Sequence, residues 1–382
     1  MSKKQNIEPG SIIANIKVIG LGGGGGNAVS RMRRDFFKGV DFIAMNTDAQ
    51  DLEYCTAKRK IHVGQNLTRG LGTGMNPELG KQAAEENRAE IVESLKGADL
   101  IFLTAGLGGG TGSGMIPVVA EAAKELGALT IAVVTKPFTF EGAQRARIAQ
   151  EAVAKLKEKV DTLIVIPNDR IFTVINKDTP LLKAFEVVDD VLKDAVLGIA
   201  DLVTMPGIIN VDFADVKAIM RDAGTALVGI GASSGQDRAV KAVGQALSSP
   251  LLEISIDGAK GVLFGISGNR DLKMSEINDI ARTIAEAIDS NAKVIFGAYH
   301  DTKMKPGQIK VTIIATGFNG HAINKPLPTA STLFTSPSRE SDLLMGPVEK
   351  DGAKDKVREE RKPSAKKSDD VWDIPTFLRK KK

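Results

Sequence analysis

An unbroken run of five glycines, residues 22–26, lies between a short apolar segment and a helical pattern. Glycine in an ordered segment is less favourable than alanine by about 0.5–1 kcal/mol, so an ordered run needs a compensating interaction. A phosphate group held by backbone N–H groups at the start of a helix is the usual one. Because the flanking strand and helix patterns are both clear, the run indicates a phosphate-binding loop rather than a flexible hinge.

The same run also satisfies the dinucleotide-binding pattern G-x-G-x-x-G through Gly20, Gly22 and Gly25. Asp48 follows at about the twenty-residue spacing that places an acidic group on a ribose. An NAD-dependent enzyme is therefore an alternative on this evidence.

A second glycine-rich segment, residues 103–114, again follows a strand pattern and precedes a helix. A dinucleotide-binding domain needs one such loop, whereas two loops at neighbouring strand ends can hold all the phosphates of one nucleotide. Neither loop ends in the Lys-Ser/Thr pair of a Walker A loop. The two loops together favour a nucleoside triphosphate site over both a dehydrogenase and a P-loop enzyme.

Two pairs of side chains stand four residues apart, the spacing that places them on one face of a helix. Glu141 and Arg145 would, by themselves, be a surface ion pair worth about 0.2–0.5 kcal/mol. Phe185 and Asp189 would place an aromatic ring beside a carboxylate. A carboxylate accepts from both N1–H and N2–H₂ of guanine, whereas adenine offers an acceptor at N1, so this pair favours a guanine nucleotide.

Short apolar runs separated by helical patterns predict an α/β fold with a doubly wound parallel sheet that positions these residues. A helix of about 37 Å should follow and lead to a smaller α+β domain. In the first domain we expect strands at 15–20, 40–45, 100–105, 129–135 and 162–166, and a helix at 27–34. In the second we expect strands at 226–230, 261–266, 294–299 and 309–315, and helices at 237–247 and 272–288.

The expected division of the chain follows from these patterns and from a tail rich in Pro, Ser, Thr, Lys and Glu. It comprises a disordered arm (1–11), a nucleotide-binding domain (12–179), a central helix (180–205), a C-terminal domain (206–316), a disordered linker (317–369) and a partner-binding peptide (370–382).

Composition narrows the function further. The chain has 382 residues, 39 of them glycine, and a formal net charge of +4, which gives no global electrostatic support to nucleic-acid binding. A single cysteine excludes an intramolecular disulfide, and three scattered histidines form no metal-binding cluster. No run is long enough for a membrane span and the first residues do not resemble a signal peptide, so we expect a cytoplasmic protein.

The second glycine loop, Gly108-Gly109-Gly110-Thr111-Gly112-Ser113-Gly114, resembles the signature of the tubulin/FtsZ GTPase superfamily, and in particular its bacterial cell-division branch. Further segments that resemble the family follow in order. They are residues 20–29, 46–48, 70–80, 135–138, 166–169 and 210–215. Thr73 and Met75 stand where the family has smaller residues, in a loop that resembles the one sensing the terminal phosphate.

The resemblance implies GTP or GDP as the ligand, with Mg²⁺ on the phosphates. It also implies that Glu141 bonds the ribose, Arg145 stands over the ribose and phosphates, and Asp189 accepts from guanine. Asn168 would contact the base edge and Phe185 would stack on the ring. The other nucleotide-binding residues implied are Gly22, Gly23, Gly24, Gly26, Asn27, Asn46, Gly72, Thr73, Gly74, Ala105, Gly106, Gly108, Gly109, Gly110, Thr111, Gly112 and Pro137.

Neither glycine loop contains a general base. Asp212 and Asp215 have the spacing of a helix-capping pair. By resemblance these two carboxylates and Asn210 also complete the active site on the nucleotide of the next subunit. Such a contact is heterologous and does not close, so it generates a head-to-tail homopolymer.

The last residues regain apolar side chains after the polar linker, including Asp373, Ile374, Pro375, Phe377 and Leu378. They resemble the tail peptide of the division GTPases, which implies membrane-tethered division adaptors as partners and a location at the mid-cell ring. Two alternatives stay open on sequence alone: a filament-forming GTPase of the same superfamily with another task, and an NAD-binding enzyme.

Overall fold

The computed structural model describes residues 14–35, 39–173, 175–176, 178–205, 207–249, 256, 258–301 and 304–318. The N-terminal arm, most of the linker and the terminal peptide expected from the sequence lie outside these residues. Among the described helices, none is long and apolar enough to cross a membrane.

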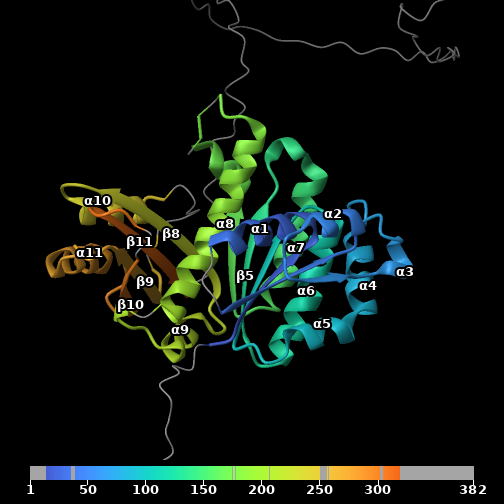
Figure 1. The fold of residues 1–382 in the computed structure, drawn as a ribbon, viewed down its shortest axis with the longest axis horizontal. Helices are drawn as coiled ribbons and strands as arrows, with labels where there is room; N and C mark the ends of the chain where they lie inside the picture. Colours follow the sequence, from blue (N-terminus) through green and yellow to red (C-terminus); the bar gives the residue numbers. More distant parts are fainter. Residues whose placement is uncertain are drawn as a thin grey trace, which may run out of the picture. The chain divides into compact units, whose positions relative to one another are not determined.

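In the described part, eleven strands form one sheet in the order β3-β2-β1-β4-β5-β6-β8-β11-β9-β10-β7 (Figure 1). All pairs from β3 to β8 are parallel, whereas β11 is antiparallel to both of its neighbours. β10 is parallel to β9, and β7 is antiparallel to β10. The bounds are β1 (Ile16–Leu21), β2 (Val40–Asn46), β3 (Arg59–His62), β4 (Leu100–Gly106), β5 (Leu129–Lys136), β6 (Thr162–Pro167), β7 (Gly207–Ile209), β8 (Gly224–Ser234), β9 (Gly261–Gly268), β10 (Lys293–His300) and β11 (Gln308–Thr316).

The helices connect these strands and cover both faces of the sheet. They are α1 (Gly22–Asp35), α2 (Ala49–Tyr54), α3 (Gln65–Thr68), α4 (Pro77–Glu86), α5 (Arg88–Leu95), α6 (Gly110–Glu125), α7 (Ala143–Lys157), α8 (Leu181–Thr204), α9 (Phe213–Met220), α10 (Arg238–Leu247) and α11 (Met274–Glu286). Two 3₁₀ helices, η1 (Thr139–Glu141) and η2 (Asn168–Thr173), follow β5 and β6.

Three large hydrophobic cores hold the layers together, and a small fourth one contains Phe138, Ile171 and Val188. Side chains of α1, α8 and α9 pack on one face of the parallel strands, and side chains of α4, α5, α6 and α7 pack on the other. A third core lies between β8, β9 and β11 and the helices α10 and α11. α8 also contacts residues of β8 to β11 through the first core, so this helix joins the two parts of the sheet (Figure 1).

The predicted fold class is confirmed, and so is the long helix, which runs from Leu181 to Thr204. Every predicted strand is present with small shifts at its ends. One boundary was wrong: α1 begins at Gly22 rather than at Asn27, so the glycine run forms the first turns of the helix. Nothing in the sequence predicted β3, β7 or α2 to α5, whereas the spacing of Asp212 and Asp215 had indicated the start of α9.

Candidate functional site

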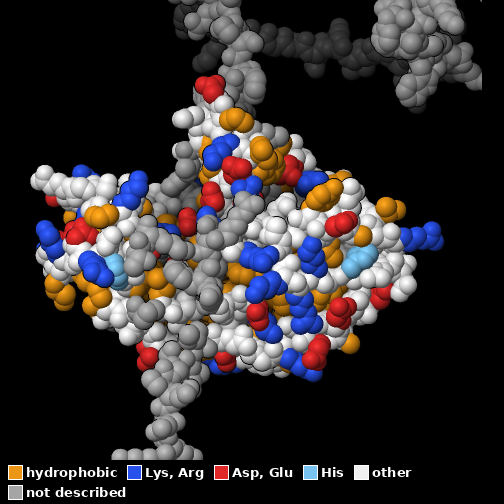
Figure 2. Space-filling model, viewed as in Figure 1, with side chains coloured by type: hydrophobic (Ala, Val, Ile, Leu, Met, Phe, Trp, Pro, Cys, Tyr) orange, Lys and Arg blue, Asp and Glu red, His pale blue; other side chains and the backbone are white. Residues whose placement is uncertain are grey.

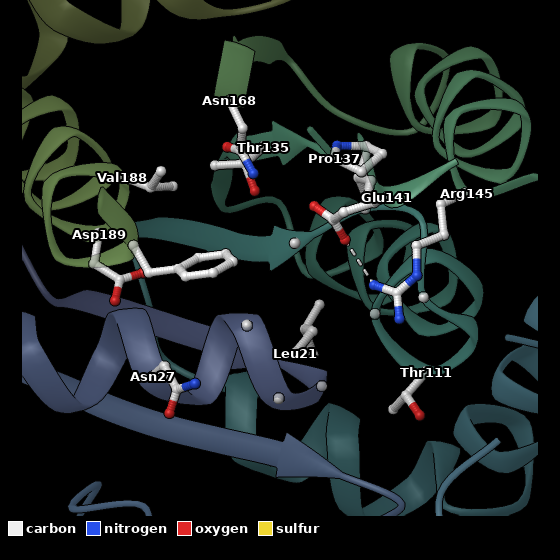
Figure 3. A pocket seen from close by; sticks show the side chains of 18 of the residues that line it. Leu21, Asn27, Thr111, Thr135, Pro137, Glu141, Arg145, Asn168, Val188 and Asp189 are labelled. Atoms are coloured by element: carbon white, nitrogen blue, oxygen red, sulfur yellow. Dashed lines mark hydrogen bonds and ion pairs between the residues drawn. The ribbon is translucent and has the colours of Figure 1, made fainter. Parts of the chain in front are cut away.

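The candidate site lies where the direction of winding reverses. β1 and β4 are neighbours in the sheet, and the helix that follows each strand packs on a different face. In an open parallel sheet, ligands bind at the carboxyl ends of the strands at such a switch point. A cavity of about 1080 Å³ opens there, between the starts of α1 and α6 and the first half of α8 (Figure 3).

Two helix starts form the floor of this cavity. α1 begins at Gly22 and α6 begins at Gly110, and both residues line the cavity. The first N–H groups of a helix have no partner within it, and they carry the positive end of the helix dipole. Two such ends at one cavity make it a site for a group with several negative oxygens.

Gly22 and Gly109 have different surroundings in this cavity. At Gly22 the φ angle is +68°, and a Cβ atom would lie 2.9 Å from the backbone nitrogen of Gly112, so the two loops pack main chain on main chain. At Gly109 a Cβ atom would meet nothing within 4 Å of the protein, yet the residue lines the cavity. The space beside Gly109 is therefore open to a ligand.

A buried amide faces the same cavity. Asn168 is 6% exposed, and its Oδ1 atom has no hydrogen-bond partner. Figure 3 shows its side chain directed into the cavity from the end of β6. A buried polar group without a partner costs about 1–3 kcal/mol, so a ligand with a donor at this point would remove that cost.

Asp189 lies on the α8 side of the cavity, opposite Asn27 of α1 (Figure 3). Its side chain is 15% exposed, and its Oδ2 atom is 2.8 Å from Nε of Arg31. Burial raises the pKa of the Asp189 carboxyl to about 6, and the Arg31 guanidinium opposes part of that rise. The carboxylate is therefore ionised at neutral pH and can accept two donors from a base edge.

Phe185 stands one helical turn before Asp189, and 39% of its surface is exposed in the cavity. Its ring meets the buried ring of Phe138 edge to face, with the centroids 5.6 Å apart. Edge-to-face contacts of this kind orient aromatic rings. Phe138 therefore supports a flat, partly exposed surface on which a base could stack.

Glu141 and Arg145 form the expected ion pair, with Oε2 and Nη1 2.8 Å apart (Figure 3). They do not share one helix, as the sequence predicted, because Glu141 ends η1 and Arg145 lies in α7 beyond Gly142. Glu141 also accepts a hydrogen bond from the Phe138 N–H at 2.9 Å. The hydrogen bond to Oε1 thus fixes the orientation of the Glu141 carboxylate, whose Oε2 pairs with Arg145.

Most of the nucleotide-binding residues expected from the sequence line this cavity. They are Gly22, Gly23, Gly24, Asn27, Thr73, Gly74, Gly106, Gly109, Gly110, Thr111, Gly112, Pro137, Glu141, Arg145, Asn168, Phe185 and Asp189.

Five others lie outside the cavity wall and make internal contacts. The carbonyl of Gly26 accepts from the Cys55 thiol, Asn46 donates to Asp51, and the N–H of Gly108 donates to Ser113. Gly72 faces Asp48, and Ala105 is fully buried.

Sequence reasoning missed ten lining residues: Leu21, Ser30, Arg31, Met75, Leu107, Thr135, Leu182, Glu186, Val188 and Leu192. For Arg31 a signal was present, because it stands four residues after Asn27 and shares its helix face. Leu182 likewise precedes Asp189 by seven residues on α8.

The three residues expected to be catalytic lie elsewhere. Asn210, Asp212 and Asp215 are exposed and line no part of the cavity. Asp212 occupies the N-cap position of α9, but its side chain makes no capping hydrogen bond, so the expected capping pair does not form. Asn210 instead accepts from the Gly207 N–H at 2.6 Å.

The cavity can bind a nucleotide, but it offers little for hydrolysis. No histidine is among the described residues that line it, and its three carboxylates belong to Glu141, Glu186 and Asp189. Glu141 is bonded to Arg145 and Phe138, and the other two lie beside Arg31. A general base near the glycine loops is therefore missing from the described wall.

On the face shown in Figure 2, Lys and Arg side chains lie among Asp and Glu side chains, so the charge of that surface is mixed. The formal net charge of the whole chain is also small, at +4.

Comparison with known proteins identifies relatives of both parts of the chain. Residues 15–176 match the model of the GTPase domain of the Tubulin/FtsZ family, and residues 224–319 match the FtsZ family C-terminal domain. An empty FtsZ dimer from M. jannaschii is 46% identical, with a TM-score of 0.76, over 80% of this chain and 88% of that one.

Two more distant structures share the fold. CetZ1 from Haloferax volcanii, a GDP-bound monomer, has a TM-score of 0.70 at 22% identity, over 80% of this chain and 95% of that one. CetZ2 from the same organism, a GTPγS-bound protofilament, has a TM-score of 0.68 at 22% identity, over 79% and 92%.

Proposed function

Because the chain belongs to the tubulin/FtsZ family of GTPases, we propose that it polymerises head to tail and hydrolyses GTP where two copies meet. It binds guanine nucleotide and is a GTPase. We propose further which residues supply the general base that the cavity wall lacks, and which cellular structure the filaments form.

The separation of the cavity from the acidic segment 210–215 carries the proposal. About 22 Å of α8 separates Asp189 from the end of that helix at Thr204, and the acidic segment follows beyond β7. Asp212 and Asp215 are exposed, and neither lines the cavity. Because these carboxylates lie outside the cavity of their own subunit, we infer that a second copy supplies them.

Two of the similar structures are assemblies, which supports self-association of this chain. One is a dimer of FtsZ, and a more distant one is a protofilament of CetZ2. A contact between the cavity end of one copy and the 210–215 segment of the next uses two different surfaces. Such contacts build open filaments unless the rotation between subunits closes a ring.

At this contact we assign each group a role in the attack of water on the terminal phosphate, which yields GDP and inorganic phosphate. Asp212 and Asp215 orient the water and receive its proton, and Asn210 positions the water by hydrogen bonding. Acid–base assistance of this kind contributes about 10²–10⁴ in rate. The starts of α1 and α6 hold the negative oxygens through backbone N–H groups.

Mg²⁺ on the phosphates is part of the proposal. The described residues contain no group of three or more His, Cys, Asp or Glu side chains that could hold a metal ion. Mg²⁺ prefers oxygen ligands and often binds through substrate phosphates and water. The cavity fits an ion that arrives with the nucleotide, where it would neutralise charge on the phosphates.

The cellular role follows from the same family membership. We propose that the filaments form the cytokinetic ring at the division site in the cytoplasm. The peptide 370–382 would bind a membrane-tethered adaptor through Asp373, Ile374, Pro375, Phe377 and Leu378, which lie outside the described residues. The domain division expected from the sequence is likewise a proposal, supported by the separate core of α10 and α11 on β8, β9 and β11.

Mixing two defective variants tests the shared active site. Asp212→Asn should bind GTP but hydrolyse it slowly, and Asp189→Asn should keep its acidic segment but bind GTP weakly. At a GTP concentration that saturates only the intact cavity, an equimolar mixture should be clearly more active than the sum of its components. It should stay below the parent activity, because only some contacts would join an intact cavity to an intact acidic segment. If the mixture is no more active than the sum of its components, the two halves do not combine across copies. A specific activity that stays constant on dilution to nanomolar protein would also contradict the proposal.

A further inference from the structure

The loop 70–76 approaches the start of α6 through a chain of three hydroxyl groups. Oγ1 of Thr47 is 2.7 Å from Oγ1 of Thr111, and Oγ1 of Thr73 is 3.1 Å from that same Thr111 atom. Thr47 is fully buried and Thr73 is 7% exposed. Thr111 and Thr73 line the cavity, whereas Thr47 does not.

The backbone of this loop is under strain. Met75 has a φ angle of +62°, in the left-handed region that residues other than glycine seldom adopt. Gly70, Gly72 and Gly74 also have positive φ angles. Such conformations persist only where surrounding contacts hold them.

Two contacts hold the loop against α6. A Cβ atom on Gly110 would lie 2.3 Å from Oγ1 of Thr73 and 2.6 Å from the nitrogen of Asn76, so the loop packs directly on the helix start. The Thr73 hydroxyl adds a bond to Thr111 at the same place. Thr73 therefore joins a strained cavity wall to the glycine-rich floor.

In both hydroxyl pairs either oxygen can be the donor, so a bound acceptor can select one arrangement. A hydroxyl has one proton and two lone pairs, whereas a phosphate oxygen on a bound nucleotide accepts. If Thr47 and Thr73 both donate to Thr111, its two lone pairs are used and its own proton is available to an acceptor in the cavity. Every hydrogen-bonding position of the Thr111 hydroxyl is then filled once a phosphate binds.

We propose that Thr73 is a positioning residue for the nucleotide phosphates. Its hydroxyl orients the Thr111 hydroxyl toward a phosphate, and the same hydrogen bond links the loop 70–76 to Thr111. The proposal rests on the proposed function, in which this cavity holds GTP. Its consequence is a coupling between the loop and the nucleotide: the phosphate favours the hydroxyl arrangement that holds the loop, and the held loop slows release of the nucleotide.

Valine at position 73 tests this, because it has the shape of threonine without the hydroxyl. In the full chain, Thr73→Val should release a fluorescent GTP analogue about two- to tenfold faster, the effect of losing one neutral hydrogen bond. Thr73→Ser should restore the parent rate, because it keeps the hydroxyl. Amide hydrogen exchange in 70–76 of the nucleotide-free chain should rise in the valine variant and not in the serine variant.

Thr68→Val is the matched control. Thr68 is also buried and close to this loop, but its hydroxyl donates to the carbonyls of Thr47 and Gly64 rather than to the Thr111 hydroxyl. It should lower stability without changing nucleotide release. Release that is unchanged in Thr73→Val, or equally fast in Thr73→Ser or Thr68→Val, would overturn the inference.

The two proposals fail in different ways. If the parent chain binds no GTP, the proposed function and the phosphate role of Thr73 both fail, and the exchange experiment alone decides whether Thr73 holds the loop. If the parent binds GTP and the valine variant matches it in both measurements, only the role of Thr73 is wrong.

Discussion

The nucleotide cavity and the acidic segment 210–215 are built in opposite ways. The cavity floor consists of main chain, with glycines of two loops packed so closely that a side chain at Gly22 would meet the backbone of Gly112. The acidic segment follows the short edge strand β7, includes the start of α9, and exposes the side chains of Asn210, Asp212 and Asp215. The described wall of the first region can bind a polyphosphate and lacks a base, whereas the second region carries carboxylates and does not line that cavity.

If hydrolysis takes place where two copies meet, as proposed, this difference would make an isolated subunit a slow enzyme. In the cavity, hydrogen-bonding capacity is left over at Asn168 and at the helix starts, which suits binding. In the acidic segment, the Asp212 carboxylate is not used to cap α9, although it stands at the N-cap position. A carboxylate that gives up about 1 kcal/mol of capping energy remains available for another partner.

Replacing the acidic side chains should give the largest effect. We expect Asp212→Asn and Asp215→Asn each to lower GTP turnover in assembled protein by about 10²–10⁴, because water positioning and proton transfer are lost. GTP affinity should stay within about twofold of the parent, because these residues do not line the cavity. Phosphate release above the assembly threshold and equilibrium nucleotide binding measure the two quantities.

Asp237→Asn is the matched control for Asp212→Asn. Asp237 is also an exposed N-cap aspartate whose side chain makes no capping bond, but it begins α10. Turnover should be unchanged in this variant. A comparable loss in Asp237→Asn would mean that the effect reflects charge or stability rather than the acidic segment.

The second effect concerns the cavity. Asp189→Asn should weaken GTP binding by about 10–100-fold, because an amide cannot accept from two guanine donors as a carboxylate does. Discrimination against ATP should fall in parallel. Competition binding with GTP and ATP measures both, and Asp190→Asn is the control, since Asp190 is half exposed and pairs with Lys193.

Unchanged GTP affinity in Asp189→Asn would remove Asp189 from the base-recognition role. Base recognition would then depend on the other side chains that line the cavity, Asn168 and Phe185.

The sequence predicted most of the fold because the elements concerned are long or strongly apolar. β1, β4 and β5 are almost entirely buried, and the apolar face of α8 spans 24 residues. β3 and β7 carry no such signal. β3 exposes two of its four residues, and β7 has three residues at the sheet edge.

The glycine loops show why the site was only partly predictable. Glycine has a low helix propensity, so a run of it reads as a loop. In the structure the run enters α1 because close main-chain packing at Gly20, Gly25 and Thr104 leaves no room for side chains. Tertiary contacts of this kind, and the pairing of Arg31 with Asp189, cannot be derived from local patterns.

The third prediction uses pH to separate the two regions. The pKa of the folded Asp189 is raised to about 6, so its carboxyl binds a proton as the pH falls below that value. Guanine binding needs the ionised form, and GTP affinity should therefore fall about tenfold between pH 7 and pH 5. The difference in affinity between the parent and Asp189→Asn isolates this effect from titration of the phosphates.

The same group has the opposite effect on stability. Because its pKa is higher in the folded than in the unfolded chain, the Asp189 carboxyl should contribute to the free energy of unfolding increasingly as the pH falls from about 6 toward 4. Urea unfolding of the parent and of Asp189→Asn across this range measures it. A parent that loses stability relative to the variant over this interval would show that the pKa is not raised.

The smallest effect is expected from the Glu141–Arg145 pair, and it tests whether the cavity depends on main chain rather than on side chains. Arg145 is 43% exposed and Glu141 is 19% exposed, so solvent screens their attraction. A double-mutant cycle of Glu141→Gln and Arg145→Met in the nucleotide-free chain should give a coupling of about 0.2–1 kcal/mol in urea unfolding. The Arg147–Glu151 pair lies within α7, is also four residues apart and is more exposed, so it is the control. A coupling above about 2 kcal/mol at Glu141–Arg145 would mean that this cavity wall depends on a side-chain ion pair, contrary to a site assembled from backbone.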